Sequence, residues 1–323
     1  MLRRRAPQDT SNVRLAGDTP IAAVAAGVGI RGLSFYWLGR FDESLASGQQ
    51  AVQIARKMND TQFTAYTLPH IGLALAAKGS YAEAEQVFDE AQRFGREYEI
   101  WPMLARTMVM WAGYHLDIFD FAGHEAIAEE ARELARSVNF LPPLVSASLD
   151  LLFNYIQREE VGRAEQIVHE VAETVEKAAG NHGWLWRLKL AEAQAELALA
   201  RGDGAEALRL VENALAHSQP RGRVKYQAFS LETRARALAV RGRKHEAIAE
   251  ARNAVNLIRP IESPALFLRA AAALLNLDGD DMLLAEACTA AERIAAALPN
   301  EEMRRRFQTT ELVRLLDHLR PPR

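Results

Sequence analysis

Polar turns interrupt the apolar pattern of the chain at intervals of about 40 residues. Equivalent turn positions are separated by 40, 40, 40, 43, 40 and 37 residues, and they are Gly39, Gly79, Phe119, Glu159, Gly202, Gly242 and Gly279. The apolar residues on either side of each turn are three and four positions apart, which places them on one helical face. The pattern therefore predicts about seven helical hairpins.

The residues around each turn are mostly small where two helices must approach each other. In KGSYAEAEQVFDEA (78–91), for example, Ala84 and Ala91 stand five and twelve positions after the turn residue. In the preceding helix, Gly72 comes before the larger Leu75. Small side chains let the helices of a hairpin pack closely, and larger ones fill the groove between hairpins.

The repeats divide the chain into three parts. We expect a frayed tail over residues 1–20, a solenoid over 21–298, and a C-terminal capping helix and tail over 299–323. Bulky Leu152 and Tyr155 stand at positions where other repeats have small residues, which predicts an irregular or bent middle of the stack.

The pattern of residues 301–319 predicts one amphipathic helix, which either caps the stack or mediates dimerisation. Its Arg304 to Arg306 should face solvent, and its inward residues are Met303, Phe307, Leu312, Leu315, Leu316 and Leu319.

The segment 78–91, with Gly72 and Leu75, resembles the tetratricopeptide repeat consensus. This resemblance implies a right-handed α-solenoid. The usual pitch is about 34 residues, so longer helices or loops are expected here. Residues 32–60, 182–203 and 298–316 look like the C-terminal sensor region of bacterial class III adenylate or guanylate cyclase–AAA ATPase proteins. Repeats of this pitch are also typical of LuxR-type STAND ATPase regulators. Because the chain lacks a G-x-x-x-x-G-K-[ST] loop, we expect a sensor or scaffold region alone.

Composition argues against several classes of partner and cellular compartment. The chain has 39 Lys and Arg against 42 Asp and Glu, so it lacks the basic excess that nucleic-acid binding requires. No apolar run approaches the roughly 18 residues of a membrane span. The single Cys288 supports neither an internal disulfide nor a metal framework. Arg3 to Arg5 are followed too late by apolar residues to be an export signal, and a cytoplasmic protein is expected.

The sequence motifs that could indicate catalysis or cofactor binding lack the sequence context that such sites require. Gly27 to Gly32 match G-x-G-x-x-G, but no strand precedes them and no acidic residue follows at the right distance. Gly32 is already explained by hairpin packing. The histidines lack a metal-ligand spacing, and Asp278 to Asp281 are expected to form a turn rather than a calcium loop. We therefore predict a protein that is not an enzyme and has no catalytic residues, metal site or cofactor.

The first helices of the hairpins should line the inner wall of the superhelix. We predict that their exposed side chains bind a partner, and these candidates are Tyr66, His70, Arg106, Met110, Phe153, Gln157, Lys189, Glu192, Glu196 and Arg236. The alternative is that Glu192/Glu196 and Glu232/Arg236 are solvated helix faces, some paired four residues apart. Pro69 predicts a kink or a late helix start. Trp101, Trp111, Trp184 and Trp186 gather near the middle, where a partner is expected.

Two hypotheses for function follow. The first is a non-catalytic interaction or sensor scaffold that binds a protein or peptide on its concave face, without nucleic acid or membrane. The resemblance implies that the partner is an ATPase or cyclase domain, in cis or in trans. The second is a small-molecule inducer-sensing domain of a transcriptional regulator, with a closed pocket near Tyr66, His70 and Met110. An open channel would favour the first and a walled cavity the second. The sequence does not set the oligomeric state.

Overall fold

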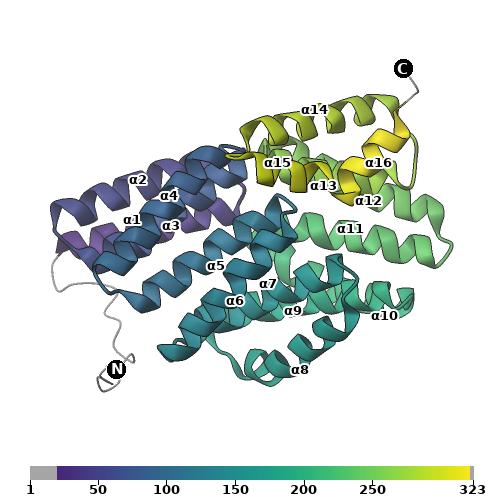
Figure 1. The fold of residues 1–323 in the computed structure, drawn as a ribbon. Helices are drawn as coiled ribbons and strands as arrows, with labels where there is room; N and C mark the ends of the chain where they lie inside the picture. Colours follow the sequence, from purple (N-terminus) through teal and green to yellow (C-terminus); the bar gives the residue numbers. More distant parts are fainter. Residues whose placement is uncertain (1–19, 321–323) are drawn as a thin grey trace.

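The computed structural model describes residues 20–320, and this part of the chain folds into sixteen α-helices without strands (Figure 1). Fourteen of them form seven consecutive hairpins, which confirms the predicted all-α solenoid. The expected tail over residues 1–20 lies outside the described residues, except for Pro20. The hairpin helices are α1 (Pro20–Trp37), α2 (Phe41–Lys57), α3 (Thr61–Lys78), α4 (Tyr81–Glu97), α5 (Trp101–Asp117), α6 (Phe121–Ser137), α7 (Leu141–Gln157), α8 (Val161–Lys177), α9 (Gly180–Ala200), α10 (Gly204–Ser218), α11 (Val224–Val240), α12 (Lys244–Ile258), α13 (Pro264–Leu275) and α14 (Asp281–Ala297).

The turn within each of the first six hairpins passes through the left-handed backbone region, which glycine enters at low cost, whereas Gly279 in the seventh turn does not have a positive φ. Gly39 and Gly79 have φ of 75° and 87°. Phe119 and Glu159 stand at the equivalent positions of the next two hairpins, and their φ values are 63° and 59°. The sequence alignment of the first six turns therefore reflects one shared backbone conformation, which glycine adopts in some units and larger residues adopt in others.

Helices of 17 residues account for the long pitch. Each of α4 to α8 has 17 residues, and links of three residues join them. The irregularity expected at Leu152 and Tyr155 does not change these lengths. Both side chains are buried, and the hydroxyl of Tyr155 donates to Oε1 of Glu129 at 3.0 Å, so the extra bulk is accommodated. The change in length comes one hairpin later, at α9, which has 21 residues.

The odd-numbered helices form the inner wall of the superhelix, because each packs against the next odd-numbered helix as well as against its own hairpin partner. Gly32 of α1 shows how close the two helices of a hairpin come. A Cβ at this position would lie 3.2 Å from Cβ of Ser47 in α2. Gly27 to Gly32 all lie within α1, so the G-x-G-x-x-G match is a helix-packing pattern.

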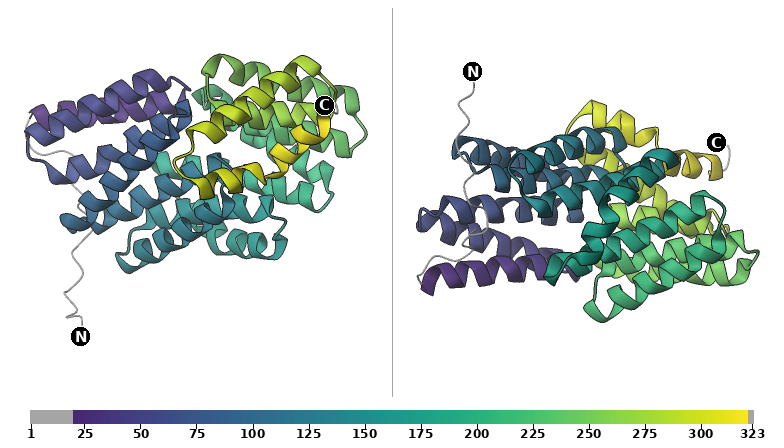
Figure 2. Two further views of the ribbon diagram at one scale, coloured as in Figure 1. Left: turned by 45° about the horizontal axis from the view of Figure 1, so that its top comes forward. Right: turned by 90° about the horizontal axis from the view of Figure 1, so that it is seen from below.

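The stack curves until its first three hairpins meet its last ones, as two views of the ribbon show (Figures 1 and 2). The turns inside hairpins form one edge of the solenoid, the turn edge, and the links between hairpins form the other, the loop edge. Where the ends meet, the turn edge of the early hairpins packs on the loop edge of the late ones. Gly39 contacts Ile261, and a Cβ on Gly79 would lie 2.9 Å from Cγ of Pro264. We call this contact the seam.

Aromatic and charged side chains reinforce the seam. The rings of Trp37 and Tyr226 stack with centroids 5.8 Å apart. Nζ of Lys225 lies 2.5 Å and 2.6 Å from the two carboxylate oxygens of Asp117. A single apolar core consequently runs from hairpins 2 and 3 into hairpins 6 and 7. The sequence pattern gave no indication of this closure.

The C-terminal segment differs from the single helix that its pattern predicts. It forms two short helices, α15 (Glu301–Gln308) and α16 (Glu311–Leu319), which pack against α14 and against α13 and α14, respectively. The break occurs because Thr310 begins a new helix, its hydroxyl accepting from the amide of Val313 at 3.4 Å. Met303, Phe307 and Leu316 are buried, and the other predicted inward residues, Leu312, Leu315 and Leu319, are half-buried.

One arginine of the cap also departs from the expectation. Arg306 does not face solvent, since its Nε lies 3.3 Å from Oδ1 of Asp120, and Phe307 packs near Phe119 with centroids 6.4 Å apart. The cap therefore joins the seam to hairpin 3.

Elsewhere, Asp280 accepts from the amide of Leu283 at 2.9 Å and begins α14, as expected for a turn. None of the helices in residues 20–320 has the length and apolar character needed to cross a bilayer.

Candidate functional site

All ten predicted partner-binding residues lie on the odd-numbered helices of the inner wall. The structure brings four of them together on α3 and α5 as a group that we call the Arg106 site, namely Tyr66, His70, Arg106 and Met110. It places four others, Lys189, Glu192, Glu196 and Arg236, on α9 and α11. Phe153 is buried in the core of the middle hairpins, and Gln157 is half-buried at the end of α7.

Arg106 is the centre of the first group. Its Nη1 donates to the carbonyl oxygen of Tyr66 at 3.0 Å, and its Nη2 lies 2.7 Å from Nε2 of His70. The guanidinium also lies over the ring of Tyr66, 4.3 Å from the centroid. Among the described residues, no carboxylate pairs with Arg106, and burial lowers its pKa. A partly buried positive charge without a counter-charge is costly, so this arrangement favours an added anion.

The protonation of His70 follows from its neighbour. Arg106 can only donate, so Nε2 of His70 must accept and the ring proton is on Nδ1. Burial and the charge of Arg106 hold the pKa of His70 well below its usual range, which keeps the ring neutral. Nδ1 is buried and has no partner in the described residues. The unused groups at this site are therefore donors on both His70 and Arg106.

The inner wall beside Arg106 is open. Gly113, two turns further along α5, could carry a Cβ that would meet nothing within 4 Å. Met110 between them and Tyr66 on α3 are both half-buried. Pro69 lies inside α3, which begins at Thr61, so a late helix start is excluded. The site thus combines unused hydrogen-bond donors with accessible apolar and aromatic surface.

The second group is a buried polar network between α9 and α11. Glu192 and Glu196 are each only 1% exposed, which contradicts their interpretation as solvated helix faces. The hydroxyl of Ser230 donates to Oε2 of Glu192 at 2.6 Å. Oγ1 of Thr233 lies 2.7 Å from Oε1 of Glu192 and 2.5 Å from Oε1 of Glu196. These contacts satisfy carboxyl groups that would otherwise destabilise the interior.

Arginines on the next helices complete this network. Arg236 pairs with Glu196 at 2.6 Å, and Arg269 of α13 pairs with Glu232 at 2.7 Å. The alternative interpretation, in which Glu232 and Arg236 pair within one solvated helix face, is therefore wrong, because both side chains reach across to neighbouring helices instead. Burial raises the pKa of Glu192 to about 7. For Glu196, burial acts in the same direction, but Arg236 and Arg269 outweigh it and lower the pKa.

Charged residues near the superhelix axis were not all found from the sequence. Lys189 pairs with Asp150 of α7 at 2.6 Å, whereas Lys225 and Asp117 join helices 108 positions apart. Burial lowers the pKa of Lys225, but the facing Asp117 reverses the shift and raises it. Asp117 and Lys225 stand at helix ends, where helical periodicity assigns no partner, so only the closure of the stack could reveal them.

Two cavities lie at the seam, and neither is lined by Tyr66, His70 or Met110. One is a closed pocket of about 20 Å³ that holds a single water at most, beside the buried hydroxyl groups of Tyr81 and Tyr114. The other is an open cleft of about 760 Å³ between the first turn, the link before α13, and α14. Its walls include Lys78, Glu262 and Arg293.

A buried histidine and a buried aspartate lie together at the turn of hairpin 3. His115 and Asp120 form a buried pair, with Nδ1 and Oδ2 2.8 Å apart, but Asp120 is occupied in capping α6 through the amide of Gly123. Within residues 20–320, no three His, Cys, Asp or Glu side chains are grouped in a way that would hold a metal ion. These contacts stabilise the turn of hairpin 3.

The four tryptophans of the middle region have different environments. Trp186 is buried and its Nε1 donates to Oγ of Ser146 at 3.1 Å. Trp111 is half-buried and donates to Oε2 of Glu85 at 3.0 Å. Trp184 is also half-buried, with the guanidinium of Arg223 above its ring. Trp101 alone among the four is exposed, at the start of α5 on the loop edge.

Comparisons with known proteins found likenesses only among solved structures. No protein-family model matches the chain, and no curated protein matches it. A tetratricopeptide repeat protein from Parabacteroides merdae aligns over 91% of this chain and 99% of its own, with 16% identity and a TM-score of 0.43. The TPR2AB domain of yeast Sti1, in a complex with pHSP90, aligns over 92% and 98%, with 17% identity and a TM-score of 0.31.

Proposed function

We propose that this protein is a non-catalytic scaffold that binds a polypeptide on the inner wall of its superhelix, at the Arg106 site. The observation that carries the proposal is a cluster of donors without acceptors. Arg106 has no carboxylate partner among the described residues, and the buried Nδ1 of His70 is also unpartnered. A carboxylate on the partner would supply the missing negative charge and accept from the guanidinium of Arg106.

The surroundings of Arg106 favour a polypeptide over a free anion. Tyr66 and Met110 offer half-buried apolar surface, and Gly113 leaves room for a main chain to approach α5. An extended segment bound along the wall would place an acidic side chain or C-terminus on Arg106 and an apolar side chain on Met110. The sequence resemblance supports an ATPase or cyclase domain of a bacterial signalling protein in the cytoplasm as the source of that segment.

A displayed library of short random peptides tests this function. Selected peptides should be rich in Asp, Glu or a free C-terminal carboxylate. Arg106→Met should weaken their binding about 10- to 100-fold, because the charge-assisted bonds to the carboxylate are lost. Fluorescence polarisation with labelled peptides gives the dissociation constants.

Arg93→Met is the matched control for that experiment. Arg93 is exposed on α4, so its loss removes the same charge from the outer wall and should leave binding within about twofold. Circular dichroism at matched concentrations checks that both variants fold. Selection of neutral peptides, or equal binding by the wild type and Arg106→Met, would contradict the proposal.

A second candidate function is the sensing of a small molecule in the seam cleft. Its volume of about 760 Å³ lies in the range of ligand pockets. A thermal-shift screen of charged metabolites would detect it, since a ligand bound across the seam stabilises the fold. Arg293→Ala in the cleft wall should abolish such a shift while Arg106→Met leaves it unchanged.

A further inference from the structure

The seam shows that the two edges of this solenoid fit one another. There, the turn edge of hairpins 1 and 2 covers the loop edge of the late hairpins. Leu38 beside the first turn contacts Gly222, where a Cβ would lie only 2.7 Å from Cδ2 of the leucine. Gly79 packs on Pro264 in the same way. Turn edge against loop edge is thus a contact that the repeat geometry of this chain forms.

Two stretches of edge stay uncovered by the seam. They carry five of the seven large apolar side chains that are exposed in residues 27–180 and 183–320. On the loop edge of hairpins 2 to 4 these are Tyr98, Trp101 and Leu141, with exposed fractions of 48%, 40% and 48%. On the turn edge of hairpins 6 and 7 they are Val240 and Met282, with 55% and 73%. Clustered apolar exposure of this kind marks interaction surfaces.

The charges beside Tyr98 and Val240 are opposite in sign. Tyr98 stands between Glu97 and Glu99, both exposed and neither paired with another described residue. Val240 is followed by Arg241, and Lys244 begins the next helix. Both of these cations are exposed and likewise form no ion pair within residues 20–320. Unpaired negative charge therefore flanks Tyr98, and unpaired positive charge flanks Val240. Met282, on the turn of hairpin 7, instead follows the exposed Asp280 and Asp281, so the complementary charges are confined to the turn of hairpin 6 and the link between hairpins 2 and 3.

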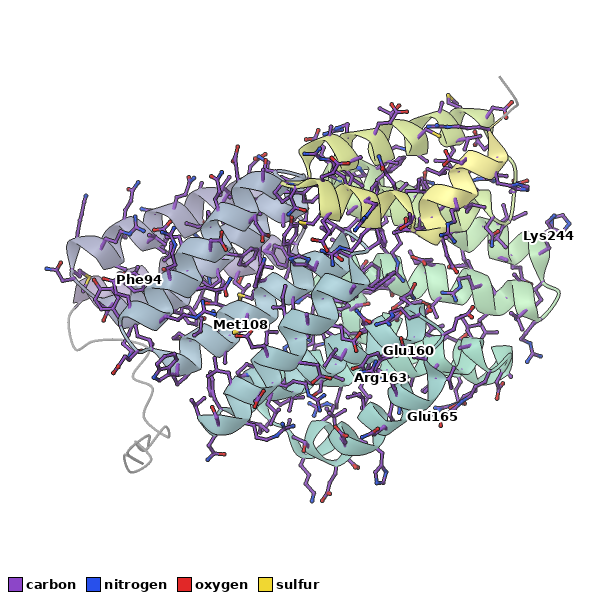
Figure 3. The ribbon with its side chains drawn as sticks, in the orientation of Figure 1. Phe94, Met108, Glu160, Arg163, Glu165 and Lys244 are labelled. Carbon is purple, nitrogen blue, oxygen red and sulfur yellow. The ribbon has the colours of Figure 1, made fainter. Side chains whose placement is uncertain are left out.

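One molecule cannot bring these two edges together. Figure 3 labels Phe94, whose ring packs on Tyr98 with centroids 4.5 Å apart, at one end of the molecule and Lys244 at the opposite end. We propose that the turn of hairpin 6 docks on the link between hairpins 2 and 3 of a second copy of this chain. Such a contact is head-to-tail, so in a pair one copy keeps its loop edge free and the other keeps its turn edge free. Further copies then add at both ends, and the assembly extends beyond a dimer.

Charge reversal tests this assembly. The wild type should associate beyond a dimer at about 100 µM in low salt and dissociate in high salt, as sedimentation equilibrium would measure. Glu97→Lys with Glu99→Lys makes both contact sites positive, and Arg241→Glu with Lys244→Glu makes both negative. Each double variant alone should stay monomeric. An equimolar mixture of the two should associate again, because opposite edges then face each other between unlike copies.

Two further variants separate this contact from general charge effects. Glu133→Lys with Glu176→Lys makes the same change of net charge on the exposed outer helices α6 and α8, and should associate like the wild type. Val240→Asp should reduce association without reversing the basic residues. A wild type that is monomeric at about 100 µM in low salt overturns the proposal. So does association of either double variant alone, or a mixture of the two that stays monomeric.

Discussion

The hydroxyl of Thr233 has one hydrogen and three oxygen neighbours. These are Oε1 of Glu192, Oε1 of Glu196 and the carbonyl oxygen of Phe229, at 2.7, 2.5 and 2.9 Å. If Glu192 and Glu196 were both ionised, the single hydroxyl hydrogen could serve only one of the three oxygens. At least one other short contact would then place the lone pairs of two oxygens against each other. A proton on Glu192 removes that repulsion, and the raised pKa of this residue agrees with the geometry. Sequence pattern alone missed the pair, because helical periodicity treats a glutamate as a solvated position.

The proton on Glu192 predicts how the stability of the protein depends on pH. Glu192 has a folded-state pKa of about 7, above the ordinary value of 4.5, so its stabilising contribution is full below pH 4.5 and is lost as the pH rises through 7. The wild type should lose about 2 kcal/mol relative to Glu192→Gln between pH 5.5 and pH 8. Urea denaturation of both proteins at the two pH values measures the difference.

Comparison with the glutamine variant is needed because a buried histidine acts in the opposite direction. Burial lowers the pKa of His124 to about 4, so its contribution is lost as the pH falls below its ordinary value of 6.5. This effect is common to both proteins and cancels in the difference. Parallel pH profiles for the wild type and Glu192→Gln would show that Glu192 does not bind the proton.

At the scale of single helices, two glycines differ in whether a neighbouring helix packs against them. Gly72 faces the next helix of its hairpin, and a Cβ there would lie 2.8 Å from Cζ of the buried Phe88. Gly113 is also inside a helix, but a Cβ there would meet nothing within 4 Å. The repeat pattern in the sequence identified Gly72, since contacts within a hairpin depend on local spacing. It could not distinguish the open environment of Gly113, which depends on the curvature of the whole stack.

These two positions predict opposite effects of one substitution. Gly72→Ala should destabilise the protein by about 1 to 3 kcal/mol, because Phe88 must move within a packed interface. Gly113→Ala should stabilise it by up to about 1 kcal/mol, because alanine is the better helix former and has room. Thermal and urea unfolding of both variants give the values. Equal effects of the same sign would show that helix packing at Gly72 is looser than described.

The closure of the solenoid belongs to the scale of the whole molecule. Hairpin number and turn positions follow from spacing within about 40 residues, so the sequence predicted them, whereas it left open whether helices or loops lengthen the pitch. The seam depends on a small rotation at every hairpin, added over five or six units. Asp117 and Lys225 therefore meet without any local pattern that pairs them. The same limit applies to the Arg106 site, where periodicity placed the residues on the inner wall but did not show that Arg106 lacks a counter-charge.

The contribution of the seam can be measured through its ion pair. In a double-mutant cycle with Asp117→Ala and Lys225→Ala, we expect a coupling energy of about 1 to 2 kcal/mol, since both groups are partly buried. The exposed pair Glu173 and Lys177 on α8 is the control, and its coupling should be below about 0.5 kcal/mol. Equal coupling in the two cycles would mean that the seam pair is as solvated as a surface pair.

The contact between Gly39 and Ile261 also changes how the molecule comes apart. In an open repeat array each unit touches only its neighbours, so the terminal units fray first and unfolding spreads inward. Here the first hairpin is held by the link before the last one, and neither can open without exposing the apolar core of the other. Such long-range contacts raise the contact order and form only after the intervening hairpins have folded. The terminal hairpins, the least protected parts of an open array, thus share the cooperativity of the whole fold.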